Sequence, residues 1–361
     1  MENNTTIRRL GDFICEVNER NSNGFISLSQ GICNLKYFQN PRQVSATPEL
    51  DKIVRTGQFA YNRATTRNGD KISIALREGP DCTVSSAYCV FYITDENVID
   101  PHWLWLWFKR PDFDRYAIFK SHGSAHEFFE FETMCNVKLS VPPIEEQRAI
   151  VARHRAIEHK IDVNHRLIAA LEETARTIYR HTFIDNIDPE NLPQGWRCVS
   201  INDVCNMSAG RDKPAEFSPI ETEYFCIPIF SNSAEQKGLF GYTKKPTIKW
   251  QTVTISARGT IGVTFIRRNP YVPIVRLISL WPKTDKEINL EYLYFWLSLN
   301  RIEGDGAVQE QLTVPKLGEM EIILPPSNLL NEFQKQVIPL LSLSDSLYKE
   351  TEILSQKLSA L

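Results

Sequence analysis

The chain has 361 residues, of which 42% are hydrophobic and 24% are charged, and 41 basic against 44 acidic side chains give a net charge of -3. This composition is typical of a globular protein, and no apolar run approaches the length of a membrane-spanning helix. The stretch Met1–Asn4 lacks the basic and apolar regions of a signal peptide, so we expect a cytoplasmic protein that does not bind a membrane. A chain of this length is too long for one ordinary core and predicts two domains.

The cysteines favour a reducing compartment. Eight are scattered along the chain without a C-x-x-C pair. Cys82/Cys89 and Cys198/Cys205 repeat a seven-residue spacing, but no histidine lies near enough in sequence to complete a zinc site. We therefore interpret them as buried free thiols and predict no metal site.

Residues 1–142 have the pattern of an α+β globule with a basic stretch in its middle. From Lys52 to Arg77, six basic residues stand against one acidic residue. Asn68-Gly69 predicts a tight hairpin inside this stretch. Loops that carry Arg, Asn and Thr between short strands supply side chains that pair with base edges, although a solvated surface hairpin has the same pattern. The DNA contacts predicted for this globule are Tyr61, Asn62, Arg63, Thr66, Arg67, Asn68, Lys71 and Ser124.

A long helix is predicted over residues 143–186. It follows the tryptophan-rich stretch Trp103–Phe108, which we interpret as a core helix, and begins directly after Pro142-Pro143. Its apolar residues recur with a heptad period, as in a coiled coil, and Asn164 in this seam is a residue type that sets register. The predicted interface residues are Ile150, Ile157, Ile161, Asn164, Ile168, Leu171 and Ile178.

Residues 187–325 repeat the pattern of the first globule. From Gln236 to Thr284 there are nine basic residues and no Asp or Glu. The stretch Val253–Ile266 predicts two strands joined by a Gly-containing turn with Arg258 at its tip. Tyr292–Leu297 again predicts a core helix. The DNA contacts predicted for this globule are Lys244, Lys245, Ser256, Arg258, Thr260, Arg267, Arg268, Gln309 and Gln311.

A second long helix is predicted over residues 326–361, directly after Pro325-Pro326. Pro339 is expected in its first turn or at a kink. Its seam residues are Leu340, Leu347, Leu354 and Leu358. Because both helices share a period and are amphipathic, we expect them to pack antiparallel. The predicted fold is therefore α+β and duplicated: two similar globules, joined and followed by long helices that pair as an antiparallel coiled coil and hold the globules apart at about 1.5 Å per residue.

Motifs for enzymatic chemistry are missing from the sequence. It contains no Asn/Asp-Pro-Pro-Tyr/Phe tetrapeptide of amino-methyl transfer and no phosphate-binding Gly-rich loop followed by Lys-Ser/Thr. His122, His126 and Cys135 lie close in sequence, but loops collect such residues by chance. We predict a protein without catalytic activity and without a cofactor of its own.

The segment Val141–Ile150 resembles the junction between target-recognition domain and conserved helix in specificity subunits of Type I restriction–modification systems. Gly306–Leu317, followed by Ile322–Pro326, resembles the second such junction, so the resemblance spans the whole chain. It implies a subunit in which each globule, a target-recognition domain, reads one half of a bipartite site in double-stranded DNA. It also implies two methyltransferase subunits docked on the helices and a restriction and translocase subunit, with AdoMet, ATP and Mg on those partners. The second junction lacks the Glu-Gln pair of the first, which puts symmetric docking in doubt.

Two alternatives stay open from the sequence. One is a stand-alone DNA-binding regulator or decoy, which needs the same basic globules but no partner. The other is the specificity subunit of a related Type II methyltransferase–nuclease system. The base sequence that is read does not follow from the residues, because such domains combine loop contacts with deformation of the DNA.

Overall fold

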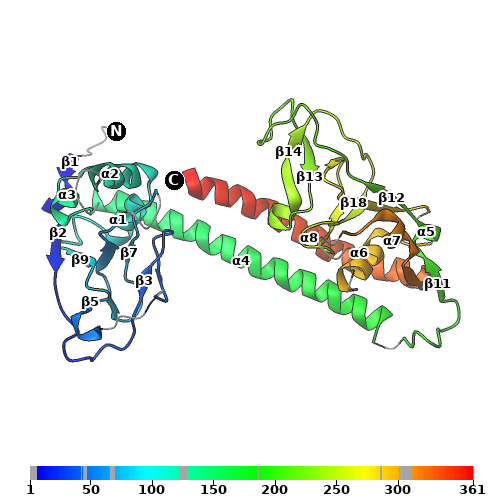
Figure 1. The fold of residues 1–361 in the computed structure, drawn as a ribbon, viewed down its shortest axis with the longest axis horizontal. Coiled ribbons are helices and arrows are strands. Elements are labelled where there is room, and N and C mark those ends of the chain that lie inside the picture. Colours follow the sequence, from blue (N-terminus) through cyan, green and yellow to red (C-terminus); the bar gives the residue numbers. More distant parts are fainter. Residues whose placement is uncertain are drawn as a thin grey trace. The chain divides into compact units, whose positions relative to one another are not determined.

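The computed structural model describes residues 6–41, 43, 47–65, 70–121, 128–185, 187–284, 287–300, 302 and 311–360. The chain forms two compact units, residues 1–159 with 358–361 and residues 160–357. Both units mix strands and helices, which confirms the predicted α+β class (Figure 1). The predicted boundaries at 142, 186 and 325 lie near the ends of helices and strands, whereas the division into units falls within the first long helix, α4.

The first unit is built around a four-stranded antiparallel sheet with the strand order β2-β9-β6-β7. Its strands are β2 (Ile14–Val17), β9 (Tyr88–Ile93), β6 (Phe59–Asn62) and β7 (Ile74–Leu76). Three two-stranded pairs complete the unit: β1 (Thr6–Arg9) with β10 (Lys138–Val141), β3 (Gly31–Ile32) with β4 (Phe38–Gln39), and β5 (Lys52–Val54) with β8 (Cys82–Val84). Its helices are α1 (Pro101–Phe108), α2 (Pro111–Ser121), α3 (Phe131–Cys135) and the start of α4 (Ile144–Phe183).

The second unit repeats this plan. Its four-stranded sheet has the order β12-β18-β15-β16, formed by β12 (Cys205–Ala209), β18 (Ile278–Pro282), β15 (Thr252–Ile255) and β16 (Thr264–Arg267). A three-stranded sheet joins β14 (Leu239–Thr243), β13 (Ile227–Phe230) and β17 (Val272–Pro273), and β11 (Arg197–Ser200) pairs with β19 (Glu321–Leu324). The helices are α5 (Ile201–Val204), α6 (Leu290–Leu299), α7 (Val314–Glu319) and α8 (Ser327–Ala360).

The two strand orders are the same when the elements are matched in chain sequence, which confirms the predicted duplication. β2, β9, β6 and β7 correspond to β12, β18, β15 and β16, and the pair β1-β10 corresponds to β11-β19. Helices α1, α3 and α4 then correspond to α6, α7 and α8. Helix α2 stands apart, because the described residues between α6 and α7 contain no helix.

The tryptophan-rich helices lie in the cores, as predicted. In the first unit, Trp103, Leu104 and Phe108 of α1 pack with Phe59 and Phe91 of the sheet. The Asp100 side chain caps α1 by accepting from the backbone N–H groups of His102 and Trp103. In the second unit, α6 contacts β15 and β16, and its buried residues join the largest core of that unit.

Gln147 connects the start of α4 to the first unit. Its side chain is fully buried, accepts from the N–H of Asp100 over 2.9 Å and donates to the carbonyls of Val98 and Pro142 over 2.9 and 2.8 Å. In the second unit the connecting side chain belongs to the core helix and not to the long helix. Asn289, the cap of α6, donates to the carbonyl of Leu330 on α8 over 2.9 Å. The Gln of the Glu-Gln pair is therefore a structural residue, and Asn289 replaces it in the second half.

Helices α4 and α8 pack antiparallel within the second unit. Asn164 donates to Glu350 and Thr351 over 2.9 and 3.2 Å, and Ser344 donates to Glu172 over 3.3 Å. Rising numbers on α4 thus face falling numbers on α8, which confirms the predicted antiparallel pairing. The predicted apolar seam residues are half-buried on both helices: Ile150, Ile157, Ile161, Ile168, Leu171, Ile178, Leu340, Leu347, Leu354 and Leu358.

Pro339 is found in the interior of α8, so the first of the two expected places, the first turn, is wrong, and a kink at Pro339 stays a prediction. Its exposed position on the outer face of the helix avoids the seam, although its missing N–H removes one backbone hydrogen bond.

Candidate nucleic-acid interface

The connection between β15 and β16 in the second unit is a short loop that closes on itself. Ser256 Oγ accepts from the N–H of Val263 over 2.9 Å and donates to the carbonyl of Thr260. Gly259 and Gly262 have φ values of +69° and +92°, a region that L side chains rarely adopt. The predicted strand pair with Arg258 in its turn is confirmed, because β15 and β16 pair from Ile255↔Thr264 onward.

Gln311 holds the Arg258 side chain. The amide oxygen Oε1 of Gln311 accepts from Nε of Arg258 over 3.1 Å and from Nη2 over 2.8 Å. Gln311 comes from the segment before α7, where Leu312 donates its backbone N–H to the carbonyl of Ala257 over 3.0 Å. The guanidinium is half-buried and fixed in one orientation. Planar, orientated guanidinium groups are suited to bidentate pairing with guanine or with a phosphate.

A basic cleft adjoins Arg258. It has a volume of about 730 Å³ and is lined by the end of β12, by Phe240 of β14 and by the turn before β18. Arg211, Lys213 and Arg276 line it together with Arg258, against Asp212 as the one acidic residue of the lining. The turn places Val275 and Arg276 at φ values of 51° and 65°, so the backbone is held in a strained form where it meets the cleft.

Sequence reasoning missed Arg211 and Lys213 as site residues. They lie outside the basic stretch 236–284 and next to Asp212, so nothing in the local pattern separates them from solvated charges. The strand order brings them together with Arg258, because β12 ends and β18 begins at the end of the sheet where the β15–β16 loop stands.

In the first unit, Arg63 lies on the connection after β6; its position matches that of Ala257, the residue before Arg258. Its guanidinium lies over the Phe128 ring at 5.7 Å, donates from Nε to the carbonyl of Ala87 over 3.2 Å and lies 3.5 Å from Glu130. Asn62 accepts from the N–H of Ala64 over 3.1 Å, which shapes the turn that carries Arg63.

An equivalent backbone hydrogen bond is present at both sites. Phe129 donates its N–H to the carbonyl of Arg63 over 2.9 Å, just as Leu312 does to Ala257. In each unit the segment before α3 or α7 therefore lies against the connection that carries the arginine. Phe128 in the first unit and Gln311 in the second contact the arginine side chain from equivalent positions.

Three predicted DNA contacts are wrong, because their side chains are buried. Tyr61 is 0% exposed, belongs to the core and donates its hydroxyl to the carbonyl of Phe129. Ser256 is 2% exposed and closes the β15–β16 loop. Arg267 is 5% exposed between the rings of Phe230 and Phe265, and burial lowers its pKa to about 10.

Arg268 is committed to the fold of the second unit. It donates to the buried Glu291 of α6 over 3.2 Å and lies 3.8 Å from Asp345 of α8. Both Arg267 and Arg268 stand at the end of β16 remote from the Arg258 loop, since Arg267 pairs with Thr252 and Thr264 with Ile255. The prediction that Arg268 contacts DNA conflicts with these ion pairs.

The remaining predicted residues are exposed or lie outside the described part of the chain. Lys71, Thr260, Lys244 and Lys245 are exposed, and Lys244 pairs with Glu216 over 2.5 Å. Predicted contacts that lie outside the described residues are Thr66, Arg67, Asn68, Ser124 and Gln309. Asn68-Gly69, with its predicted tight hairpin, also lies there.

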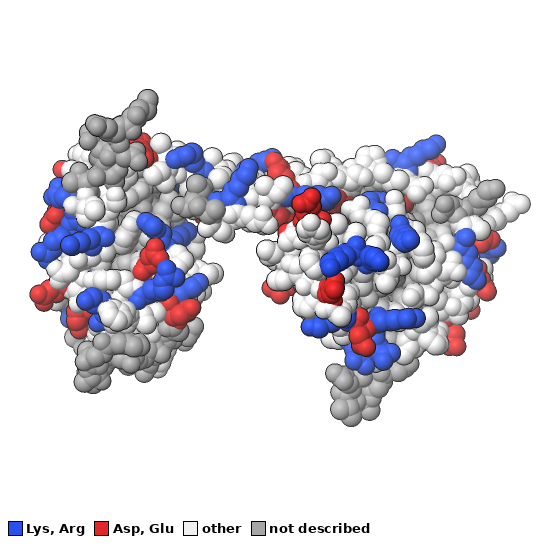
Figure 2. Space-filling view, turned by 90° about the horizontal axis from the view of Figure 1, so that it is seen from above, with Lys and Arg blue, Asp and Glu red and all other residues white. Residues whose placement is uncertain are grey.

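The basic stretches do not form uniform basic faces. Lys52 and Arg77 of the first stretch are buried, at 6% and 7% exposure, and Arg55 pairs with Glu19 and Asp81. Figure 2 shows basic side chains interspersed with acidic ones on the face of each unit that is in view. Among the described residues, the loops and cleft around Arg63 and Arg258 are therefore the best candidates for the interface.

The described residues contain no group of three or more His, Cys, Asp or Glu side chains that could hold a metal ion. Within the same part of the chain, no helix is long and apolar enough to cross a membrane. All eight cysteines are free. Burial raises the pKa of Cys89 and of Cys205 to about 12, as expected of unreactive thiols, whereas Cys198 is exposed.

Comparison with known proteins agrees with this geometry. The family model of the Type I restriction modification DNA specificity domain matches residues 29–173 and 193–360. The chain belongs to this family. The two matched stretches fall in the two halves that share a strand order, the first beginning after β2, and each extends into the long helix that follows.

Curated relatives and a solved structure extend the comparison. A putative type I specificity subunit of Mycoplasma pneumoniae is 26% identical over 231 residues, covering 62% of this chain and 61% of that protein. A second one from the same organism is 32% identical over 153 residues, covering 41% and 45%. The chain thus spans less than two thirds of the length of either relative. The crystal structure of an S subunit of a Type I restriction–modification system from M. genitalium has a TM-score of 0.66 at 14% identity, with 99% of this chain and 95% of that one covered, and shares the fold.

Proposed function

We propose that this specificity-family chain reads a bipartite site in double-stranded DNA, with one half-site for each unit. The observation that carries the proposal is the repeated construction of the arginine site. In both units an arginine on the connection after β6 or β15 is contacted by the residue that precedes the donor of the same backbone hydrogen bond. Two equivalent sites on one chain suit a target with two halves.

The chemistry of the two sites supports base reading near a phosphate surface. Arg258, orientated by Gln311, can present its Nη atoms to a guanine edge. Arg211, Lys213 and Arg276 line the neighbouring cleft, where the phosphate backbone of the same DNA would lie. Arg63 is stacked on Phe128 and can serve the first half-site in the same way.

We further propose that two methyltransferase subunits dock on α4 and α8 and that a restriction and translocase subunit joins the complex. AdoMet, ATP and Mg would be bound by these partners, and the chain would act in the cytoplasm as a non-catalytic subunit. The buried faces of α4 and α8 pack inside the chain, which leaves their outer polar faces for such partners. Because Gln147 is buried, its absence from the second junction does not argue for asymmetric docking.

Methylation mapping tests this function directly. The chain is expressed with a candidate Type I methyltransferase subunit, and modified bases are located across the host genome. The expected result is one motif with two specific halves and a non-specific gap, lost when the chain is omitted. A methylation pattern independent of the chain would contradict the proposal. A chain that binds DNA without any methylation, and whose removal abolishes control of gene expression, would instead favour a stand-alone regulator.

A further inference from the structure

Helix α2 holds both ends of the β6–β7 connection in the first unit. At one end, Thr65 donates its hydroxyl to Ser121 Oγ over 2.9 Å. At the other end, Ile72 donates its backbone N–H to Asp114 Oδ1 over 3.1 Å. Asp114 and Ser121 are separated by two turns of the helix and so lie on one face of α2. All four residues are buried, at 5% exposure or less.

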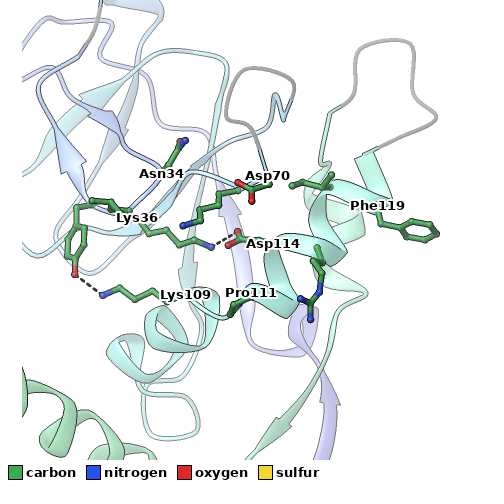
Figure 3. Close-up of a pocket in the computed structure, with 12 residues that line it drawn as sticks. Asn34, Lys36, Asp70, Lys109, Pro111, Asp114 and Phe119 are labelled. Atoms are coloured by element: carbon green, nitrogen blue, oxygen red, sulfur yellow. Dashed lines mark hydrogen bonds and ion pairs between the residues drawn. The ribbon is translucent and has the colours of Figure 1, made fainter. Parts of the chain in front are cut away.

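A buried ion pair fixes the Asp114 anchor. Lys36 Nζ lies 2.6 Å from Asp114 Oδ1, and the two side chains are 3% and 7% exposed. Figure 3 shows the two side chains pointing toward each other from the β3–β4 turn and from α2. Lys36 also donates to the carbonyl of Phe108 over 2.6 Å, and its own carbonyl accepts from Trp105 Nε1 over 3.0 Å. A carboxylate paired in this way accepts a stronger, charge-assisted bond from Ile72.

The anchored connection lies beside a cavity of about 740 Å³. Asp70 and Lys71 of the connection line it together with Arg115 and Phe119 of α2. In Figure 3, Asp70 stands close to the Lys36–Asp114 pair, whereas Phe119 points away from it. Lys71, one of the predicted DNA contacts, is thus next to Asp70 and within one residue of the anchored Ile72.

The second unit holds its corresponding loop by other means. There Ser256 closes the β15–β16 loop from within, and no helix stands between α6 and α7 among the described residues. In the β6–β7 connection, α2 supplies a partner at each end, Ser121 for Thr65 and Asp114 for Ile72, in addition to the backbone hydrogen bond from Asn62 to Ser73. Among the residues that the structure describes, a helix in this role is found in the first unit.

We propose that α2 determines the base sequence of the half-site that the first unit reads, because it fixes both ends of the connection that carries Arg63 and Lys71. Lys36, Asp114, Ser121 and Thr65 are then positioning residues that need not touch DNA. This inference rests on the proposed function. Its physical basis is that base contacts require side chains placed to about 0.5 Å, which a connection of this length does not supply unless its ends are held.

The test removes the anchors without leaving a buried charge. In K36M/D114L the ion pair is replaced by apolar side chains of similar volume, an exchange that often leaves stability unchanged. In T65V the hydroxyl that reaches Ser121 is removed at nearly constant volume. F119A is the matched control, because Phe119 lies on α2 but is 74% exposed and contacts neither anchor. Each chain is purified with its methyltransferase partner, and bound sequences are selected from a random duplex library.

The expected result is that K36M/D114L and T65V lose preference at one half-site by about ten-fold or more, the size of one bidentate base contact, and keep the other. F119A should keep both. Unfolding in urea checks that each variant is folded. If the double variant is unfolded, the half-site preference of T65V tests the inference. Folded anchor variants that retain wild-type preference at both halves would overturn the inference. A wild-type chain without any sequence preference would instead overturn the proposed function itself.

Discussion

Two arginines nine positions apart show that residue type does not decide a role here. Arg258 is half-buried, held by Gln311 and open to a basic cleft. Arg267 is sealed between two phenylalanine rings and donates to Thr254 and to the carbonyl of Lys237. The first has donors that face a cavity, whereas the donors of the second are used inside the fold. We therefore expect Arg258 to contact DNA and Arg267 to stabilise the fold.

Replacing Arg258 with Ala is expected to weaken binding to the cognate DNA by about 1–3 kcal/mol, because one bidentate base contact is lost. Binding to random duplexes should change much less. The measurement is a titration of both DNAs at fixed salt.

Lys245→Ala is the matched control, since Lys245 is exposed and any contact that it makes with DNA is expected to be with a phosphate. It should weaken both DNAs alike and reduce the salt slope by about one. Equal losses on both DNAs for Arg258→Ala would make Arg258 a phosphate contact.

At the scale of elements, the pairing of α4 with α8 contains a buried polar residue. Asn164 is 0% exposed, and its amide nitrogen has two acceptors on α8. Its Oδ1 atom has no hydrogen-bond partner among the residues that the structure describes. A buried polar group that is only partly satisfied lowers stability, and in coiled coils it is retained because it fixes register.

Replacing Asn164 with Leu should raise the free energy of unfolding by about 1–2 kcal/mol, since an unsatisfied acceptor is removed and apolar area is buried. The measurement is urea unfolding followed by circular dichroism. Leu167→Ala is a control on the same helix, because Leu167 is 46% exposed, and should change stability little. A loss of stability in Asn164→Leu would show that the two bonds from its amide outweigh the unsatisfied oxygen.

The start of α4 carries a group of ionisable residues against α1. His154 of α4 lies 3.4 Å from Glu158, and His102 of α1 lies 3.3 Å from Glu78, which also pairs with Arg155. Burial lowers the pKa of both histidines, helped by Arg155 at His102 and by Lys109 at His154, while the glutamates oppose the shift. The folded chain therefore binds these two protons less tightly than the unfolded chain does.

The free energy of unfolding should consequently decrease as the pH falls below about 6.5, the ordinary pKa of histidine, until both histidines are protonated in the folded state as well. The stabilisation is fully present above that pH. Unfolding measured in steps from pH 8 to pH 5 checks the direction, and a H102Q/H154Q variant should have a flatter dependence over the same range. A wild-type protein that gains stability toward pH 5 would contradict the assignment.

For the whole molecule, the relevant feature is that α4 is one continuous helix of 40 residues that starts in the first unit and ends in the second. If each unit reads one half-site, the length of this helix sets the gap between the halves. Inserting four residues after His159 adds about 6 Å along the helix, close to two base pairs. It also leaves the contacts of Asn164 with α8 unchanged.

The insertion variant is expected to methylate a site with unchanged halves and an altered gap. Methylation mapping in cells that lack the wild-type chain gives the result directly. An insertion of four residues in the exposed connection after Ile184 serves as the control, because it adds chain without lengthening the helix. Wild-type spacing in the α4 variant, at normal efficiency, would show that the helix does not determine the gap.

The periodic features of the molecule can be read from the amino-acid sequence. Heptads of apolar residues identified both long helices and their seam, since burial along a helix repeats every three to four residues. Dense apolar stretches such as Trp103–Phe108 identified core helices, and the Gly-containing turn at Gly259 placed Arg258 on a hairpin. The recurrence of these signals in the same order established the duplication. All of them are local, so a single stretch of chain is enough to recognise each.

The tertiary structure alone decided which polar residues are exposed. Strand alternation assigns residues to two faces but does not say that both faces are covered, so the sequence wrongly predicts Tyr61 and Arg267 as DNA contacts. The cleft beside Arg258 unites Arg211 and Arg276, which the strand order brings together from distant parts of the chain. The anchoring of Thr65 and Ile72 by α2 depends on contacts between residues 56 and 42 positions apart, respectively. Such contacts follow from how elements pack, and packing is a property of the whole chain rather than of any local pattern.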